Sequence, residues 1–175
     1  MTTRRTAAVA LAVMAALAPV SLTACSDDAE FDYSSEAQAP DRSAYSDNSE
    51  EKPDADQGLV ELELDNDARL AIWIDPDDIS KVYQQHSDPD DEDAWTEPEL
   101  LYQAGDGCLN VDADTNGEVV AAILWCYEDD AWIQQAPDQT QTVVTDDLKD
   151  WDRESRGEFF ARPHVEENGD VTWGE

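Results

Sequence analysis

Positively charged residues are scarce in this sequence of 175 residues. Ten lysines and arginines stand against 43 aspartates and glutamates, which leaves a formal net charge of −33 at pH 7. Such a chain is repelled by nucleic acids and by anionic lipid, so the composition argues against both as partners. Divalent ions and positively charged partners are compatible with it, and mutual repulsion of the acids favours solubility.

Cysteine and histidine are also rare, with three and two copies. His86 and His164 stand isolated, and no serine has the surroundings of a nucleophile. Carboxylates are so numerous that no single pair indicates a general acid and base. We therefore do not expect an enzyme.

Long apolar runs are missing as well. The longest extends from Ala7 to Val20, is interrupted by Pro19, and comes after Arg4 and Arg5. A helix that spans a bilayer needs roughly 20 apolar residues, so this run is too short. A basic start, a short apolar core and small residues at its end are typical of a secretory signal.

The end of that signal carries a more specific motif, Leu22-Thr23-Ala24-Cys25. It resembles the bacterial lipobox, in which an aliphatic residue and two small ones precede a cysteine. The resemblance implies that residues 1–24 are removed and that Cys25 carries diacylglycerol and an amide-linked acyl chain such as palmitate. The protein would then be held by its lipid at the extracytoplasmic face of the cell membrane. The alternative is an ordinary signal peptide with a chance cysteine.

Residues 25–57 are predicted to be a disordered acidic linker. Positions 26–57 contain no Leu, Ile or Val, and their eleven acids face only Arg42 and Lys52. Such a segment buries too little apolar surface to offset the entropy lost on ordering.

Residues 58–175 are predicted to form one all-β domain. Apolar and other residues alternate in Leu59–Leu64, as they do in half-buried strands. The pairs Asn116-Gly117 and Asn168-Gly169 are strong hairpin signals between such segments. We expect a small antiparallel domain of two to three hairpin or blade-like repeats after the linker.

The turns recur at residues 65–67, 116–117 and 168–169, about 50 residues apart. Ser87-Asp88 and Thr145-Asp146 each precede a tryptophan and a further strand segment. This order resembles the blades of sialidase-like glycosidase β-propellers, which implies a glycosidase-like hydrolase, or a remnant of one, as an alternative function. A closed propeller needs at least four blades, so the repeats would otherwise pack as a small sandwich.

Cys108 and Cys126 are predicted to form a disulfide, because an exported protein meets an oxidising compartment. A three-residue loop at 116–118 would place them opposite each other on paired strands. A two-residue loop would instead oppose Cys108 and Trp125, so a bridge implies an odd loop or a bulge. Two buried free thiols are the alternative.

The segment from Asp112 to Val119 matches the first half of an EF-hand calcium loop. Asp112, Asp114 and Asn116 would supply oxygen ligands, with Gly117 at the sixth position. Ile123 stands where the bidentate glutamate belongs. Calcium is therefore one hypothesis, and the plain tip of a hairpin is the other.

All six tryptophans lie beyond residue 58. Trp73 and Trp125 occupy equivalent repeat positions and are expected in the core. The candidates for stacking against a ligand at the surface are Trp95, Trp132 and Trp151. The leading hypothesis is a membrane-anchored, non-catalytic module that binds an envelope glycan or protein, and a surface protein that binds divalent cations is the further alternative.

Overall fold

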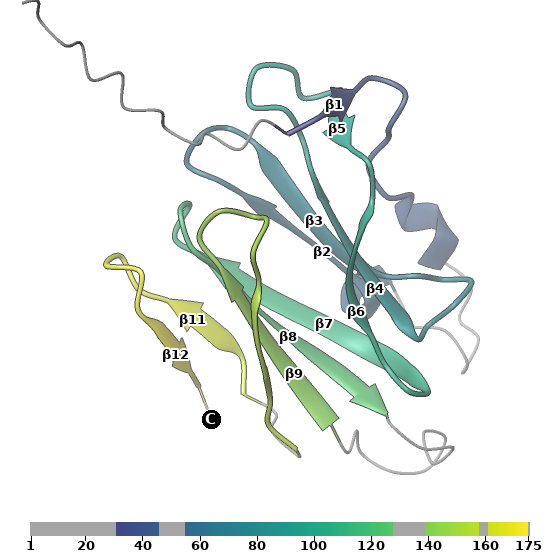
Figure 1. Ribbon diagram of the computed structural model, residues 1–175, viewed down its shortest axis with the longest axis vertical. Helices are drawn as coiled ribbons and strands as arrows, with labels where there is room; N and C mark the ends of the chain where they lie inside the picture. The colour runs from purple at the N-terminus through teal and green to yellow at the C-terminus, as the bar shows by residue number, and fades with distance from the viewer. Residues whose placement is uncertain (1–30, 46–54, 128–138, 158–160, 175) are drawn as a thin grey trace, which may run out of the picture. The chain divides into compact units, whose positions relative to one another are not determined.

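The computed structural model describes residues 31–45, 55–127, 139–157 and 161–174, which belong to one compact unit. The protein is mostly β, as the sequence predicts, and its strands form several small antiparallel sheets (Figure 1). Helical structure in these residues is confined to a 3-10 turn, η1 (Arg42–Tyr45), and one helical turn, α1 (Ala55–Gly58). Among the same residues no helix has the length and apolar character needed to cross a membrane.

Two four-stranded sheets form the body of the domain, and each is an up-and-down meander. The first sheet has the order β2-β3-β4-β6, with strands Leu59–Glu63, Arg69–Ile74, Lys81–His86 and Glu99–Gln103. The second has the order β10-β9-β8-β7, with β7 to β10 at Gly107–Thr115, Val120–Tyr127, Gln139–Thr145 and Asp152–Ser155. The repeat predicted from the sequence is therefore present as two sheets that follow the same strand order along the chain.

A third hairpin comes after these sheets and is formed by β11 (Pro163–Val165) and β12 (Val171–Trp173). The predicted turns at residues 65–67, 116–117 and 168–169 join β2 to β3, β7 to β8 and β11 to β12. Two repeats thus have four strands, and the third has two strands in the described chain.

The main core lies between the two four-stranded sheets. Leu70, Ile72 and Ile74 alternate along β3 and contribute one side of it. Val120, Ala122 and Leu124 alternate along β8 and contribute the other side. Full burial of an aliphatic side chain of this size stabilises a fold by about 1.5–3 kcal/mol, so these positions fix which face of each strand points inward.

The outer face of the first sheet is covered by residues 31–45. Trp73, from this face of β3, packs in a second core cluster with Ala37 and Tyr45. β1 (Tyr33–Ser34) pairs with β5 (Trp95–Thr96) beside that cluster. The sequence placed these residues in a disordered linker, whereas in the structure they lie against the domain. The prediction of disorder rested on the absence of Leu, Ile and Val. It did not consider the aromatic side chains of Phe31, Tyr33 and Tyr45, which supply the contacts.

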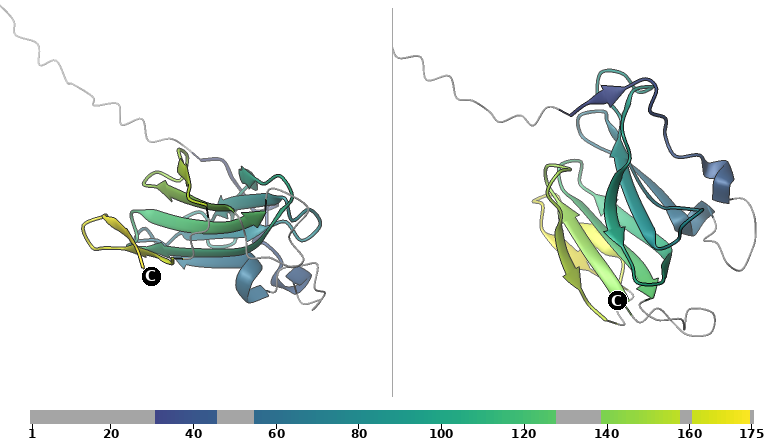
Figure 2. Two further views of the ribbon diagram at one scale, coloured as in Figure 1. Left: turned by 90° about the horizontal axis from the view of Figure 1, so that it is seen from below. Right: turned by 45° about the vertical axis from the view of Figure 1, so that its right-hand side comes forward.

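The outer face of the second sheet is covered in part by the third hairpin. Ala121 and Ile123 are fully buried on β8, and β11 lies against β7 and β8. Figure 2 shows the resulting layers, with the hairpin in yellow outside the green sheet and the N-terminal segment in purple outside the teal sheet.

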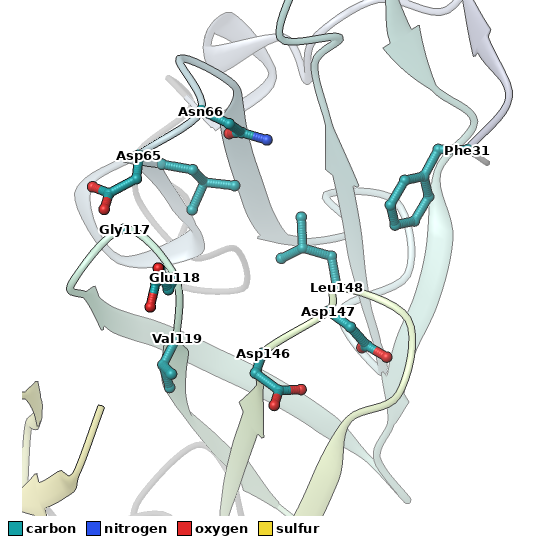
Figure 3. A pocket seen from close by; sticks show the side chains of 10 residues that line it. Phe31, Asp65, Asn66, Gly117, Glu118, Val119, Asp146, Asp147 and Leu148 are labelled. Carbon is teal, nitrogen blue, oxygen red and sulfur yellow. The ribbon is translucent and has the colours of Figure 1, made fainter. Parts of the chain in front are cut away.

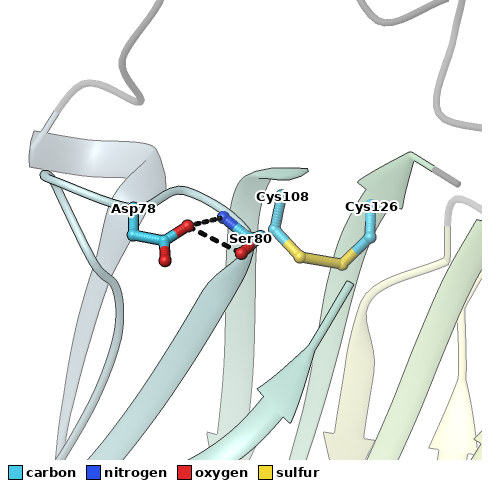
Figure 4. The surroundings of a disulfide bond; sticks show 4 residues. All are labelled: Asp78, Ser80, Cys108 and Cys126. Atoms are coloured by element: carbon cyan, nitrogen blue, oxygen red, sulfur yellow. Dashed lines mark hydrogen bonds between the residues drawn. A yellow bond between two sulfur atoms is a disulfide. The ribbon is translucent and has the colours of Figure 1, made fainter. Parts of the chain in front are cut away.

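Cys108 and Cys126 form the predicted disulfide, and both are buried (Figure 4). Thr115 pairs with Val120, so the loop has four residues and the expected three-residue loop is wrong. The bulge, which was the other expectation, is present between Cys108 and Asn110. It shifts the register by one residue and brings the two cysteines opposite each other.

Candidate functional site

A hollow in the described surface lies where the loops of the two repeats meet at one end of the sheets. It has a volume of about 710 Å³ and is bounded by the β2–β3, β7–β8 and β9–β10 turns and by Phe31 (Figure 3). It shares Val119 and Asp146 with a second hollow of about 240 Å³. That hollow shares Val144 and Asp152 with a third, of about 410 Å³.

These three adjoining hollows, which share lining residues, are together called the acidic furrow. Its apolar lining includes Phe31, Leu64, Val119 and Leu148. Seven carboxylates also line it: Asp65, Glu118, Asp146, Asp147, Asp150, Asp152 and Glu154. The arrangement suits a ligand that combines positive charge with apolar surface.

The β2–β3 and β7–β8 turns are fitted closely to each other at the furrow. The Asp65 main-chain N–H donates to Gly117 O at 3.1 Å. Gly117 has φ of 98°, and a Cβ atom there would overlap the Asp65 carboxylate. Glycine is therefore required by both the backbone conformation and the neighbouring turn.

The β9–β10 turn holds one carboxylate in a fixed position. Asp147 accepts hydrogen bonds from the main-chain N–H groups of Asp150 and Lys149, each at 2.9 Å. These bonds favour the ionised form and lower the pKa of Asp147. Leu148 has φ of 61°, a left-handed conformation that is costly for a residue with a side chain, and its carbonyl accepts from Gln84 Nε2 at 3.3 Å.

The third hollow contains the basic side chains of the furrow. Arg153 and Arg156 line it together with Trp173. The Arg156 guanidinium lies 5.4 Å from the Trp173 ring centre and 2.7 Å from a Glu154 oxygen. Trp173 was not among the predicted ligand-stacking residues, although it lies in the furrow.

The predicted calcium ligands have protein partners. Asp112 pairs with Arg162 at 3.0 Å, and Asp114 accepts from Val165 N–H at 2.9 Å and contacts His164 at 3.1 Å. Asn116 caps its own turn and donates to Glu166 O at 3.1 Å. All three side chains thus fasten the third hairpin onto the second sheet. No group of three or more His, Cys, Asp or Glu side chains arranged to hold a metal occurs in the described part of the chain.

The predicted stacking tryptophans occupy different environments. Trp95 is only 2% exposed and lies beneath the Arg69 guanidinium at 5.0 Å, so its ring faces are covered. Trp151 is half-buried and packs against the main core. Trp132 lies outside the described residues, as does Cys25.

His86 is not isolated, contrary to the sequence-based interpretation. It is buried against the Phe31 ring at 4.2 Å between ring centres, and the Tyr33 hydroxyl lies 3.3 Å from its Nδ1. Burial disfavours the charged ring and lowers its pKa to about 4, and the nearby Lys149 charge acts in the same direction. His86 is therefore a neutral component of the contact between the N-terminal segment and the first sheet.

No protein-family model, curated protein or solved structure matches this chain.

Proposed function

We propose that this protein is a lipid-anchored, extracytoplasmic binding module without catalytic activity, and that it binds an envelope partner that carries positive charge. The acidic furrow carries the proposal, because it gathers seven carboxylates around an apolar lining. A protein with a basic segment suits this surface better than a neutral glycan, which would leave the carboxylates other than Glu154 without ionic partners. Glu154 is already paired with Arg156. Single exposed ion pairs contribute about 0.2–1 kcal/mol, so several must act together, and salt will weaken binding.

The anchor in this proposal is the lipid on Cys25, which the lipobox motif supports. Only residues 26–30 separate Cys25 from Phe31, the first described residue, which lines the furrow. A fully extended chain spans at most about 3.6 Å per residue, which allows about 20 Å over this distance. A module held so closely would meet partners at the membrane surface.

The anchor is tested by labelling cells with palmitate. Wild-type protein should carry the label, whereas Cys25→Ala should not and should accumulate in the medium or as uncleaved precursor. Equal labelling of the two proteins would overturn the anchor without bearing on the furrow.

The furrow is tested by titrating the secreted Cys25→Ala chain with an oligolysine peptide and with a neutral chito-oligosaccharide. We expect binding of the peptide that weakens as salt rises. Asp146→Asn combined with Asp152→Asn should weaken it at least fivefold. The matched control, Asp90→Asn with Asp93→Asn, removes two charges from an exposed loop outside the furrow and should change the affinity less than twofold. Equal effects of the two double variants would contradict a defined binding site.

The same preparation tests the two alternative functions. Turnover of chromogenic glycosides would favour the glycosidase-like hydrolase. Saturable calcium binding that raises the melting temperature would favour the cation-binding surface protein.

A further inference from the structure

The sequence contains two Asn-Gly pairs, and each lies in the turn of a hairpin. Asparagine loses its side-chain amide most readily when glycine follows it, because no Cβ atom obstructs the approach of the glycine nitrogen to the amide carbon. Asn116-Gly117 and Asn168-Gly169 share this intrinsic reactivity. A difference between them in the folded protein therefore comes from their surroundings.

The side chain of Asn116 is half-buried and is held at both ends of its amide. Its Oδ1 accepts from two main-chain N–H groups of its own turn, the shorter bond being 2.8 Å from Val119 N–H. Its Nδ2 donates to Glu166 O of the third hairpin at 3.1 Å. The carbonyl of Gly117 accepts from Asp65 N–H of the β2–β3 turn at 3.1 Å. Attack on the Asn116 amide carbon would disturb contacts with two other turns.

The side chain of Asn168 is exposed, and both of its hydrogen bonds are made with one neighbouring residue. Its Nδ2 donates to the Asp170 carboxylate at 2.8 Å, and its Oδ1 accepts from Asp170 N–H at 3.1 Å. The Gly169 N–H donates to Glu166 O of the same turn at 2.9 Å. Hydrogen bonds at an exposed position are replaced by bonds to water at little cost. Asn168 can therefore turn toward the Gly169 nitrogen within its own hairpin.

We propose that Asn168 is a site of spontaneous deamidation, and that the fold protects Asn116 from the same reaction. The Gly169 nitrogen bonds to the Asn168 amide carbon, the bond from that carbon to Nδ2 breaks, and the Gly169 proton leaves with Nδ2 as ammonia. One water molecule then opens the five-membered imide. Opening at the side-chain carbonyl gives aspartate. Opening at the main-chain carbonyl gives isoaspartate, in which the chain continues through the former side chain.

Either product changes the border of the furrow. Gly169 lines the second hollow together with Asp146, Asp150 and Asp152, so a carboxylate at position 168 adds negative charge beside an acidic surface. Isoaspartate also adds one carbon to the main chain of the turn, where the Gly169 and Glu166 N–H groups set the register of the hairpin. The site does not depend on what the furrow binds.

The test incubates the folded, secreted Cys25→Ala chain at mildly alkaline pH and follows both Asn-Gly peptides by mass spectrometry after digestion. We expect Asn168 to convert at least about tenfold faster than Asn116, because local opening of the Asn116 turn must precede its reaction. The matched control is the same chain, reduced and unfolded in guanidinium chloride. There the two rates should agree within about threefold, since only the local sequence remains.

The variant Asn168→Gln keeps an amide at this position but adds a methylene group, which disfavours closure of the imide ring. It should abolish conversion at position 168 and leave the slow rate at Asn116 unchanged.

Equal rates at the two asparagines in the folded protein, or faster conversion of Asn116, would overturn protection by the fold. An Asn168 that stays intact in the folded protein, over the time in which the unfolded chain is converted, would overturn the site itself. None of these results bears on binding in the furrow.

Discussion

The Tyr45 hydroxyl donates a hydrogen bond to the main-chain oxygen of Ile74 at 2.7 Å, in a buried position. Tyr45 lies in a segment whose composition predicts disorder, and Ile74 ends a central strand of the first sheet. Gln85 Nε2 adds a second polar contact by donating to Gln38 O at 2.8 Å. These contacts make residues 31–45 part of the fold.

We therefore predict that Tyr45 variants destabilise the whole domain. Tyr45→Phe should lower the free energy of unfolding by about 1 kcal/mol, because a buried carbonyl loses its donor. Tyr45→Ala should lower it by about 3 kcal/mol, because an aromatic ring is also removed from a packed cluster. Urea denaturation measures both effects. An unchanged unfolding curve for Tyr45→Ala would show that the segment is a free linker after all.

The disulfide should make a large contribution to stability. Cys108 and Cys126 are 18 positions apart, and closing a loop of that size stabilises a fold by about 3 kcal/mol on the chain-entropy model. Reductant should lower the melting temperature, and more so at low salt, where repulsion among the acids opposes folding. Cys108→Ser and Cys126→Ser should each reproduce the loss, and the double variant should add little. Free thiols at both positions, found by mass spectrometry of the unreduced protein, would contradict the bridge.

His86 should make stability depend on pH. Its pKa is lowered from 6.5 to about 4 in the folded protein, so the unfolded chain takes up the proton first as the pH falls. The stabilisation is thus fully present above pH 6.5 and is lost as the pH falls toward 4. The loss amounts to about 3 kcal/mol at most, since one pKa unit corresponds to about 1.4 kcal/mol.

The measurement compares urea unfolding at about pH 7 and about pH 5 for wild type and His86→Gln. Protonation of carboxylates relieves repulsion in both proteins and acts in the opposite direction. The contribution of His86 is therefore read from the difference between the two proteins. We expect His86→Gln to lose less stability than wild type between the two pH values. Parallel behaviour of the two proteins would show that His86 is accessible to protons in the folded state.

Asp112 and Asp114 should matter for stability independently of calcium. Asp112→Asn with Asp114→Asn weakens the contacts to Arg162 and to the Val165 N–H, and we expect a loss of about 1–3 kcal/mol. The loss should be the same in millimolar calcium and in chelator. A melting temperature that falls only when calcium is present would show that these residues are ligands.

The hairpins were predictable because their signals are local. Asn116-Gly117 and Asn168-Gly169 specify turns from adjacent residues, and the alternation in β2 and β3 specifies which residues are buried. The bulge at Leu109 was not predictable in position, because it depends on how β7 meets β8 several residues from the turn. The contact of residues 31–45 was missed because scattered aromatic residues have no period to recognise.

The candidate site was less accessible to sequence reasoning. The furrow is formed by turns at Asp65, Glu118 and Asp146 and by Phe31, and only the fold brings these together. The repeat of the turns was the signal available in the sequence for this arrangement, because equivalent turns of two stacked meanders lie at the same end of the sheets. Trp95 was expected at the surface, but pairing of β5 with β1 encloses it, and that pairing involves the segment interpreted as a linker.

Hydrogen–deuterium exchange of the secreted chain, with and without the oligolysine peptide, tests the central claim most directly. A partner bound in the furrow should slow exchange in the β9–β10 turn around Asp146 and Asp147, and should leave the acidic loop at residues 88–93 unchanged. Protection spread evenly over all acidic loops, or confined to residues 88–93, would contradict a binding module with a defined site.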